Sequence, residues 1–410
     1  MKISNIKKYT DYLLLILLVA VTGFPFFYSD IEFVILGFLF SLFIFVKRKL
    51  KFNRKFITVI TFFLVIEILQ SIYFNSFEAL TFFGTYIRFG FAYFTVAALG
   101  DRFFDYYFNI IYFFAVISLI FFIPSIINND FANLIVNNIA TYFKSPFYEA
   151  GESIYEISPN IIIYTFEKSL FVSSRNSGPF WEPGAFGVFI ILAIMFRLIY
   201  THRILTFKIV LLSIALLTTT STSGYIALFL LLVLHYSFNK RVGATKYALI
   251  LMMIYGGGLM YLQIEFLGAK ANEDIILASE TTTSRFGSAL IDLQDFSRNP
   301  ILGYGRGQNR YGGREITFFS VDQHRNNGMT QLLVTYGIII FILYFLMYYK
   351  AIVSYCKRNR FNKKFAYAAL LIIFILGFSQ GIFTRPFFYA LLFVDYKKIN
   401  LTKEDDALFV

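Results

Sequence analysis

The sequence predicts an all-α, polytopic membrane protein with about 11–12 transmembrane helices. Apolar residues make up 58% of the 410 residues and only 15% are charged, whereas about a quarter of the residues of a soluble domain are charged. The charges lie between apolar runs of roughly 20 residues, the length that spans the ~30 Å hydrocarbon layer. These runs do not alternate apolar and polar residues as barrel strands do, so we expect helices.

Eleven apolar runs are long enough to be spans: 12–28, 31–46, 56–74, 78–99, 103–127, 184–200, 205–220, 222–238, 246–264, 328–349 and 365–383. A further run, 387–394, is too short to cross alone, so it is either a twelfth helix or a half-helix. The first run is too long for a cleaved signal peptide. We therefore expect residues 1–410 to form a single polytopic membrane domain.

The basic residues indicate the orientation. If the N-terminus is cytoplasmic, every short loop on that side is basic, and no short outside turn carries Lys or Arg. This bias in short loops sets the orientation of membrane proteins. It also explains the net charge of +12, so no nucleic-acid partner is expected. Two long segments, 128–183 and 265–327, are then large periplasmic loops, and long loops of this kind are usually functional.

The first large loop ends in a motif at the start of the span 184–200. The motif reads Arg175-Asn-Ser-Gly178-Pro-Phe-Trp-Glu182-Pro-Gly184, and Pro183 suits the first turn of a helix. We expect Arg175 and Glu182 to be held at the membrane surface. One interpretation is a functional pair; the other is a capped helix with a salt bridge and an interfacial Trp anchor.

The second large loop contains an amphipathic helix. Its apolar residues fall on one helical face: Phe286, Ala289, Leu290, Leu293 and Phe296. Thr283 or Ser284 would be the N-cap. The helix is expected to lie on the membrane surface or to cap a cavity. Asn299-Pro300 and the glycines that follow end it.

The same loop is rich in arginine: Arg285, Arg298, Arg306, Arg310, Arg314 and Arg325. Arginine offers a planar, permanently charged fork that suits phosphate oxygens. The loop therefore suggests a lipid-linked phosphate or diphosphate, while nearby carboxylates allow a merely solvated loop. With one cysteine and no Asp-x-Asp cluster, we expect no metal site and no cofactor.

Four other positions carry candidate chemistry. His324 is the histidine on the outside, where it could take or give a proton. Arg88 lies mid-span, so it faces a cavity or pairs with Glu67 in a structural ion pair. Arg385 lies at the outer end of the last long span. The hydroxyl run Thr218–Ser223 either lines a sugar or phosphate site or is a polar turn.

Three motifs together resemble Wzy-type O-antigen and capsular polysaccharide polymerases of the O-antigen ligase-like superfamily. The first is the Arg175–Gly184 motif. The second is Thr283-Ser-Arg285 with its helix and Asn299-Pro300-Ile-Leu-Gly303-Tyr-Gly305. The third is His324-Arg-Asn326 followed by a helix with Gly337. The motifs occupy only about 180–190 and 283–337, although the resemblance covers most of the chain.

The resemblance implies a GT-C-like, inverting, metal-independent glycosyltransferase that joins repeat units carried on undecaprenyl diphosphate at the outer face of the bacterial inner membrane. It implies lipid-linked glycans as donor and acceptor, membrane lipids around the chain, and a chain-length regulator as a partner. Fixed arginines would stabilise the departing diphosphate. We assign this role to Arg175 and Arg285, then to Arg88 and Arg385, with Arg306 and Arg310 as further diphosphate- or substrate-binding candidates.

The catalytic base is expected to be His324, with Glu182 as the second candidate; Glu182 could instead hold Arg175. Two other functions stay open. An O-antigen ligase would transfer finished glycan to lipid A core. A lipid-linked glycan transporter or flippase would tend to show internal repeats, which this sequence lacks.

Overall fold

The computed structural model describes residues 3–28, 31–143, 158–166, 175–239, 285–306 and 327–394. In these residues the regular structure is helical, apart from isolated β-bridges at Asn160–Thr165 and Phe166–Asn176. The prediction of an all-α chain is confirmed for this part of the protein.

The first half contains α1 (Ile3–Gly23), α2 (Pro25–Tyr28), α3 (Ile31–Lys47), α4 (Arg54–Tyr73), α5 (Ala79–Leu99), η1 (Gly100–Arg102), α6 (Phe103–Ile127), α7 (Asn129–Asn138) and η2 (Ala140–Phe143). The second half contains α9 (Pro183–Thr201), α10 (Phe207–Leu217), α11 (Thr222–Asn239), α14 (Arg285–Arg298), α15 (Gly328–Arg358), α16 (Phe365–Ser379) and α17 (Pro386–Phe393). The predicted span 12–28 covers parts of both α1 and α2, and each other span falls on one of these helices except 246–264, which lies outside the described residues.

Four continuous helical stretches are long and apolar enough to cross a membrane: Arg54–Tyr73, Ala79–Ile127, Pro183–Thr201 and Gly328–Arg358. The second of these comprises α5, η1 and α6. Shorter apolar helices, among them α10, α11 and α16, stand beside them. The protein is therefore embedded in a membrane, while the number of crossings stays a prediction.

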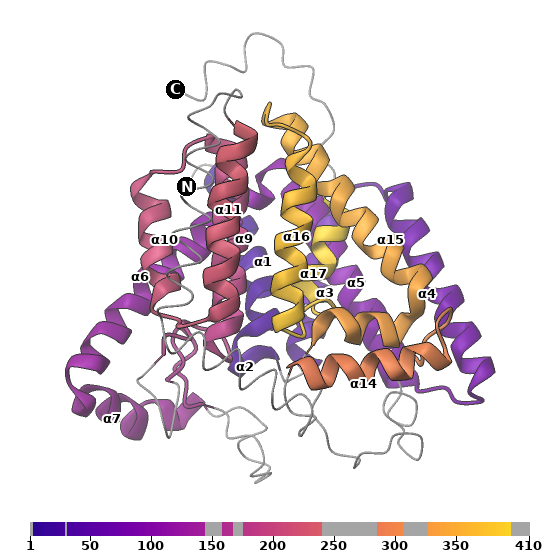
Figure 1. Ribbon diagram of the computed structural model, residues 1–410, viewed down its shortest axis with the longest axis horizontal. Coiled ribbons are helices and arrows are strands. Elements are labelled where there is room, and N and C mark those ends of the chain that lie inside the picture. Colours follow the sequence, from indigo (N-terminus) through magenta and orange to yellow (C-terminus); the bar gives the residue numbers. More distant parts are fainter. Residues whose placement is uncertain are drawn as a thin grey trace.

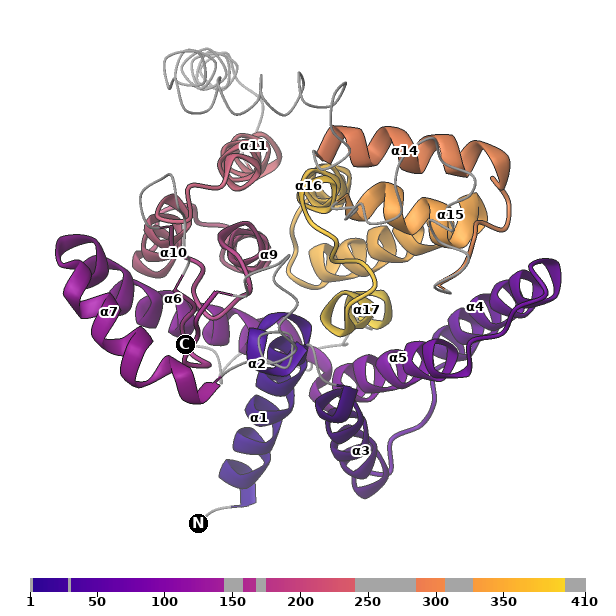
Figure 2. The same cartoon turned by 90° about the horizontal axis from the view of Figure 1, so that it is seen from below.

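Helices α9 and α17 form the centre of the bundle (Figures 1 and 2). Nearly every residue of α9 is buried, and every residue of α17 is buried. α17 begins with Pro386 in its first turn, a position that needs no backbone N–H donor. Its eight residues span only about 12 Å. The described part of the run 387–394 is thus a buried half-helix.

One end of the bundle gathers the segments predicted to be cytoplasmic, and we call it the basic end. Asp11 of α1 is completely buried and forms ion pairs with Arg48 at 2.6 Å and Arg102 at 3.2 Å. Arg358 at the end of α15 pairs with Asp101. These contacts join α1, η1 and the C-terminal ends of α3 and α15, although which side of the membrane this end faces stays a prediction.

Replacing Arg48 with alanine should destabilise the protein by about 2–3 kcal/mol, because it leaves a buried carboxylate with one partner fewer. Arg48 also donates to the Ala98 carbonyl oxygen at 2.8 Å. The melting temperature of purified protein in detergent would measure the loss. Arg54→Ala is the matched control, since Arg54 is exposed at the same end; equal melting temperatures for the two variants would contradict the prediction.

The opposite end, which we call the loop end, gathers the segments predicted to face outwards. The Trp181 N–H donates to the Gly23 carbonyl oxygen at 3.2 Å, and the Asn176 N–H donates to that of Thr218 at 3.0 Å. α14 lies across this end (Figure 1). The amphipathic helix predicted in the second large loop is thus confirmed, and it begins at Arg285.

Helix α7 was not predicted, because its ten residues are too few to give a clear periodic pattern. Its N-cap is Asn128, whose side chain accepts from the Asp130 N–H at 2.8 Å. Ile135 on its inner side packs in a small cluster with Phe122 and Tyr164. The helix therefore has a small apolar core of its own beside the main bundle.

Candidate functional site

The loop after α14, residues 299–306, is docked on a break in α15, and we call it the docking loop. The break is at Gly337, whose φ of 74° and ψ of 177° interrupt the helix. The N–H groups of Tyr304 and Gly305 donate to the carbonyl oxygens of Val334 and Thr335 at 2.9 and 2.8 Å. The loop thus gives hydrogen-bond donors to backbone carbonyl groups near the break. Apolar surroundings could not supply such donors.

The docking needs glycine on both sides. A Cβ at Gly303 would lie 2.6 Å from both the Gly337 nitrogen and the Val334 oxygen, and a Cβ at Gly337 would overlap the Ile301 carbonyl. Both residues also have positive φ, which side chains rarely adopt. Two of the glycines noted in the sequence motifs therefore allow two backbones to touch.

Gln70 of α4 forms hydrogen bonds with both the docking loop and α15. Its side-chain amide is buried and donates to the carbonyl oxygens of Leu302 and, at 2.9 Å, Thr335. The sequence pattern gave no reason to select this residue, because one glutamine in an apolar run does not reveal its partner. Gln70 joins α4, the docking loop and α15.

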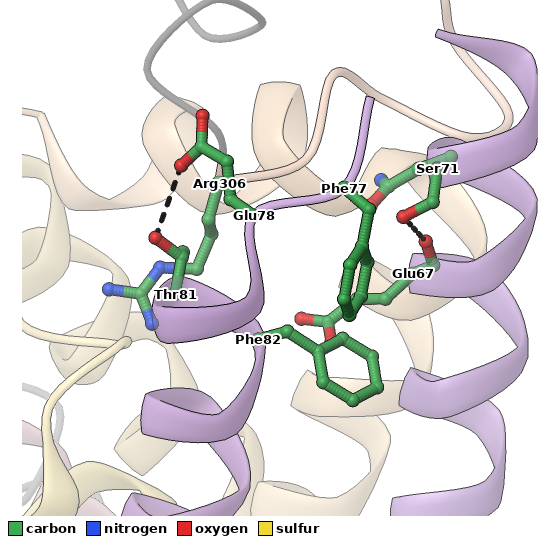
Figure 3. Close-up of a pocket in the computed structure, with 8 residues that line it drawn as sticks. Glu67, Ser71, Phe77, Glu78, Thr81, Phe82 and Arg306 are labelled. Carbon is green, nitrogen blue, oxygen red and sulfur yellow. Dashed lines mark hydrogen bonds between the residues drawn. The ribbon is translucent and has the colours of Figure 1, made fainter. Parts of the chain in front are cut away.

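The docked loop places Arg306 against α5, in a pocket of about 30 Å³ that α4 and α5 help to line (Figure 3). Its Nη1 donates to the Thr85 hydroxyl at 3.0 Å. Glu67, Gln70, Ser71 and aromatic rings also line the pocket. This volume holds about two water molecules, so Arg306 lines a small, partly open pocket.

Arg88 of α5 lies close enough to Arg306 for their charges to repel each other. The other groups that interact electrostatically with Arg88 are the hydroxyls of Tyr389 and Tyr336. No carboxylate of the described residues is among these groups. The structure forms no ion pair between Arg88 and Glu67 within the described part of the chain. The structural ion pair considered from the sequence is therefore absent, and Glu67 acts on Arg306 instead.

Tyrosine hydroxyls complete this arginine site. Tyr336 of α15 and Tyr389 of α17 lie near Arg306 and favour its charged form. Both hydroxyls are buried, and neither has a regular hydrogen-bond partner among the described residues. Burial opposes the charge of Arg306, but Tyr336, Tyr389 and Glu67 outweigh it and raise the pKa of Arg306. The guanidinium therefore stays charged and could bind an anion together with Arg88.

Arg385 forms a second junction at the loop end. Its Nη1 donates to the Thr22 carbonyl oxygen at 2.7 Å, and its guanidinium lies 3.9 Å from the centre of the Trp181 ring. Such a stack of a cation on an aromatic face is favourable. The Phe387 N–H donates to the Thr22 hydroxyl at 2.9 Å. Arg385 thus joins α1, the loop before α9 and α17.

Arg175 holds the hydroxyl turn between α10 and α11. Its Nε donates to the Thr220 hydroxyl at 2.6 Å and lies 3.2 Å from the Thr219 carbonyl oxygen. No ion pair joins it to Glu182, although the structure describes both residues. The salt bridge considered from the sequence is therefore absent. Glu182 is the N-cap residue of α9 and is partly exposed, and its side chain makes no cap hydrogen bond.

Asn176 is a fully buried residue of this region that the sequence analysis did not select. Its amide donates to the hydroxyls of Ser118 and Thr218 at 3.0 and 2.8 Å, and its Oδ1 accepts from the Gly178 N–H at 2.9 Å. It fixes the backbone between Arg175 and the start of α9. Only the tertiary contacts reveal this role.

Replacing Asn176 with alanine should cost about 2–3 kcal/mol, because buried partners lose their hydrogen bonds. The thermal midpoint in detergent would report the loss. Ser177→Ala is the control, since the neighbouring hydroxyl is equally buried and has no partner in the described residues. The prediction is wrong if the two variants have the same thermal midpoint.

The remaining site candidates are placed only in part. Arg285 is the first residue of α14 and is half-buried. His324 and Arg310 lie outside the described residues. The structure thus brings Arg88 and Arg306 together, and puts Arg175 and Arg385 in separate junctions of the loop end. No protein-family model and no curated protein matches this chain.

Proposed function

We propose that this protein is a bacterial polysaccharide polymerase, an inverting and metal-independent glycosyltransferase. It would join oligosaccharide repeat units carried on undecaprenyl diphosphate at the outer face of the inner membrane. In this proposal the basic end is cytoplasmic and the loop end faces the periplasm. Donor and acceptor are both lipid-linked glycans.

The observation that carries the proposal is the pair Arg88 and Arg306 beside Tyr336 and Tyr389. The two guanidinium groups lie close enough to repel each other, and an anion bound near both would offset that repulsion. The position within a membrane protein favours an anion attached to a lipid. A diphosphate leaving group gains negative charge as its glycosidic bond breaks, and preorganised cations lower that barrier without a metal.

Parts of two of the motifs that resemble the polymerase family lie next to this pair. The Asn299–Gly305 motif and Gly337 form one docked unit, and its next residue is Arg306. In the proposal Arg285 and Arg175 assist at the periplasmic surface, Arg385 lies near the lipid tail, and His324 or Glu182 takes the proton from the acceptor hydroxyl. A chain-length regulator would act as a partner.

The test compares bacteria that lack this chain with the same cells after the wild-type chain is restored. A polymerase predicts single repeat units on the surface without the chain and long glycan with it. Long polymer that stays on its lipid carrier when the chain is missing would show a ligase instead. Repeat units that accumulate on the cytoplasmic face would show a flippase, and unchanged glycan would exclude all three.

A further inference from the structure

Helix α14 buries polar side chains and exposes apolar ones, which is the reverse of the usual pattern for a surface helix. Its residues Ser288, Asp292 and Asp295 are 0%, 1% and 6% exposed. Its residues Phe286, Leu290 and Leu293 are 41%, 55% and 45% exposed. With 3.6 residues per turn, the first set lies on one face and the second set on the opposite face. Three of the five residues of the predicted apolar stripe therefore point away from the protein, while Ala289 is buried.

Contacts with α15 and α16 fix this rotation of α14. The Asp292 carboxylate accepts a hydrogen bond from the Thr330 hydroxyl of α15 at 2.6 Å. The ring of Phe286 meets that of Phe378 edge-on, with centroids 5.0 Å apart. The polar face is thus held against the protein, and the exposed apolar face follows from it.

The helices beside α14 also expose apolar side chains. Seen along the bundle in Figure 2, α14 lies beside α15 and α16 at the outer edge. On these neighbours Ile339, Ile342 and Leu371 are 45%, 51% and 47% exposed. Exposed apolar residues on membrane helices are expected to face lipid, which makes acyl chains the natural neighbours of α14 as well.

We propose that Phe286, Leu290 and Leu293 contact the acyl chains of membrane lipids, with α14 lying in the plane of the interface at the loop end. In water this helix would expose large apolar side chains, which is unfavourable. In lipid the same apolar side chains are removed from water. Arg285 and Arg298 stand at the two ends of α14, where long cationic side chains reach headgroup phosphates.

This contact would give α14 a mechanical role that does not depend on the reaction catalysed. The docking loop begins directly after α14, so a helix seated in lipid holds the first residue of that loop at a fixed depth. The bilayer surface would then help to set the position of Arg306, together with the backbone contacts to α15.

The experiment places an environment-sensitive fluorophore on single cysteines in a Cys356→Ser background, in the full chain reconstituted into nanodiscs. Leu290→Cys and, separately, Leu293→Cys report on α14. Ile342→Cys is the lipid control, and Lys363→Cys in the loop between α15 and α16 is the water control. Each sample is quenched once by lipids brominated on their acyl chains and once by aqueous iodide. Elution as a single species confirms that each variant is folded.

The proposal expects both α14 probes to be quenched by brominated lipid to an extent close to that of Ile342→Cys, and to be poorly quenched by iodide. Quenching like that of Lys363→Cys would place the face in water and overturn the proposal. Protection from both quenchers would also overturn it, because the face would then be covered by protein. None of these outcomes depends on whether the chain makes polymer.

Discussion

Replacing Arg306 with alanine should reduce polymer formation by about 100-fold or more. Removal of one preorganised group that stabilises transition-state charge has an effect of this size. Among the described residues, Arg306 donates a hydrogen bond to the Thr85 hydroxyl and lies close enough to Arg88 for the two charges to repel each other. A bound anion would relieve this repulsion. The measurement is the rate at which purified protein converts lipid-linked repeat units into longer glycans.

Three further variants separate the charge of Arg306 from its position. Arg306→Lys keeps the charge but loses the planar fork, so its activity should fall between those of alanine and wild type. Thr85→Val should loosen the guanidinium and lower the rate less. Arg203→Ala removes an exposed arginine at the basic end and should have no effect. Polymer formation by a folded Arg306→Ala protein at close to the wild-type rate would remove this residue from the proposed site.

Replacing Gly337 with alanine should abolish activity and lower the melting temperature. The new Cβ would overlap the Ile301 carbonyl, and the docking loop would have to leave α15. The Val334 carbonyl oxygen would then lose the Tyr304 donor, at roughly 1–3 kcal/mol for a buried group left unpaired, and the Thr335 carbonyl oxygen would keep only the Gln70 amide. Hydrogen exchange at the Tyr304 and Gly305 amides would measure this undocking directly.

Gly100→Ala is the matched control for that variant. Gly100 also has a positive φ, 55°, but a Cβ there would meet nothing within 4 Å. It therefore measures backbone strain alone, about 1–3 kcal/mol, and should leave activity intact. If Gly337→Ala behaved like Gly100→Ala, with slow exchange at Tyr304, the close backbone contact would not matter for function.

The sequence predicted the helices well and their contacts poorly. A long apolar run requires a helix because lipid offers no hydrogen-bond partners, so the spans could be assigned locally. The periodic residues of α14 predicted that helix too. Its orientation could not be predicted, since Asp292 is turned inwards by Thr330, a residue in another helix. Helix type depends on local pattern, but rotation depends on neighbours.

The same distinction applies to the candidate site. Arg88 was selected because a mid-span charge is costly, and Glu67 was considered as its partner. The structure instead puts Arg88 beside Arg306, more than 200 positions later. Only the docking of one loop on the break at Gly337 creates this pair. Sequence spacing carries no information about such a meeting, so the residue types were predictable and their grouping was not.

The break in α15 has a consequence for biogenesis. An uninterrupted helix can enter a bilayer alone, because it satisfies its own backbone. α15 cannot satisfy its own backbone near Gly337. There the backbone N–H groups of Tyr304 and Gly305 donate to carbonyl oxygens of α15. We therefore expect α15 to become stable in the bilayer only after the docking loop has packed on it, and the junction to be completed by the amide of Gln70, a residue synthesised much earlier.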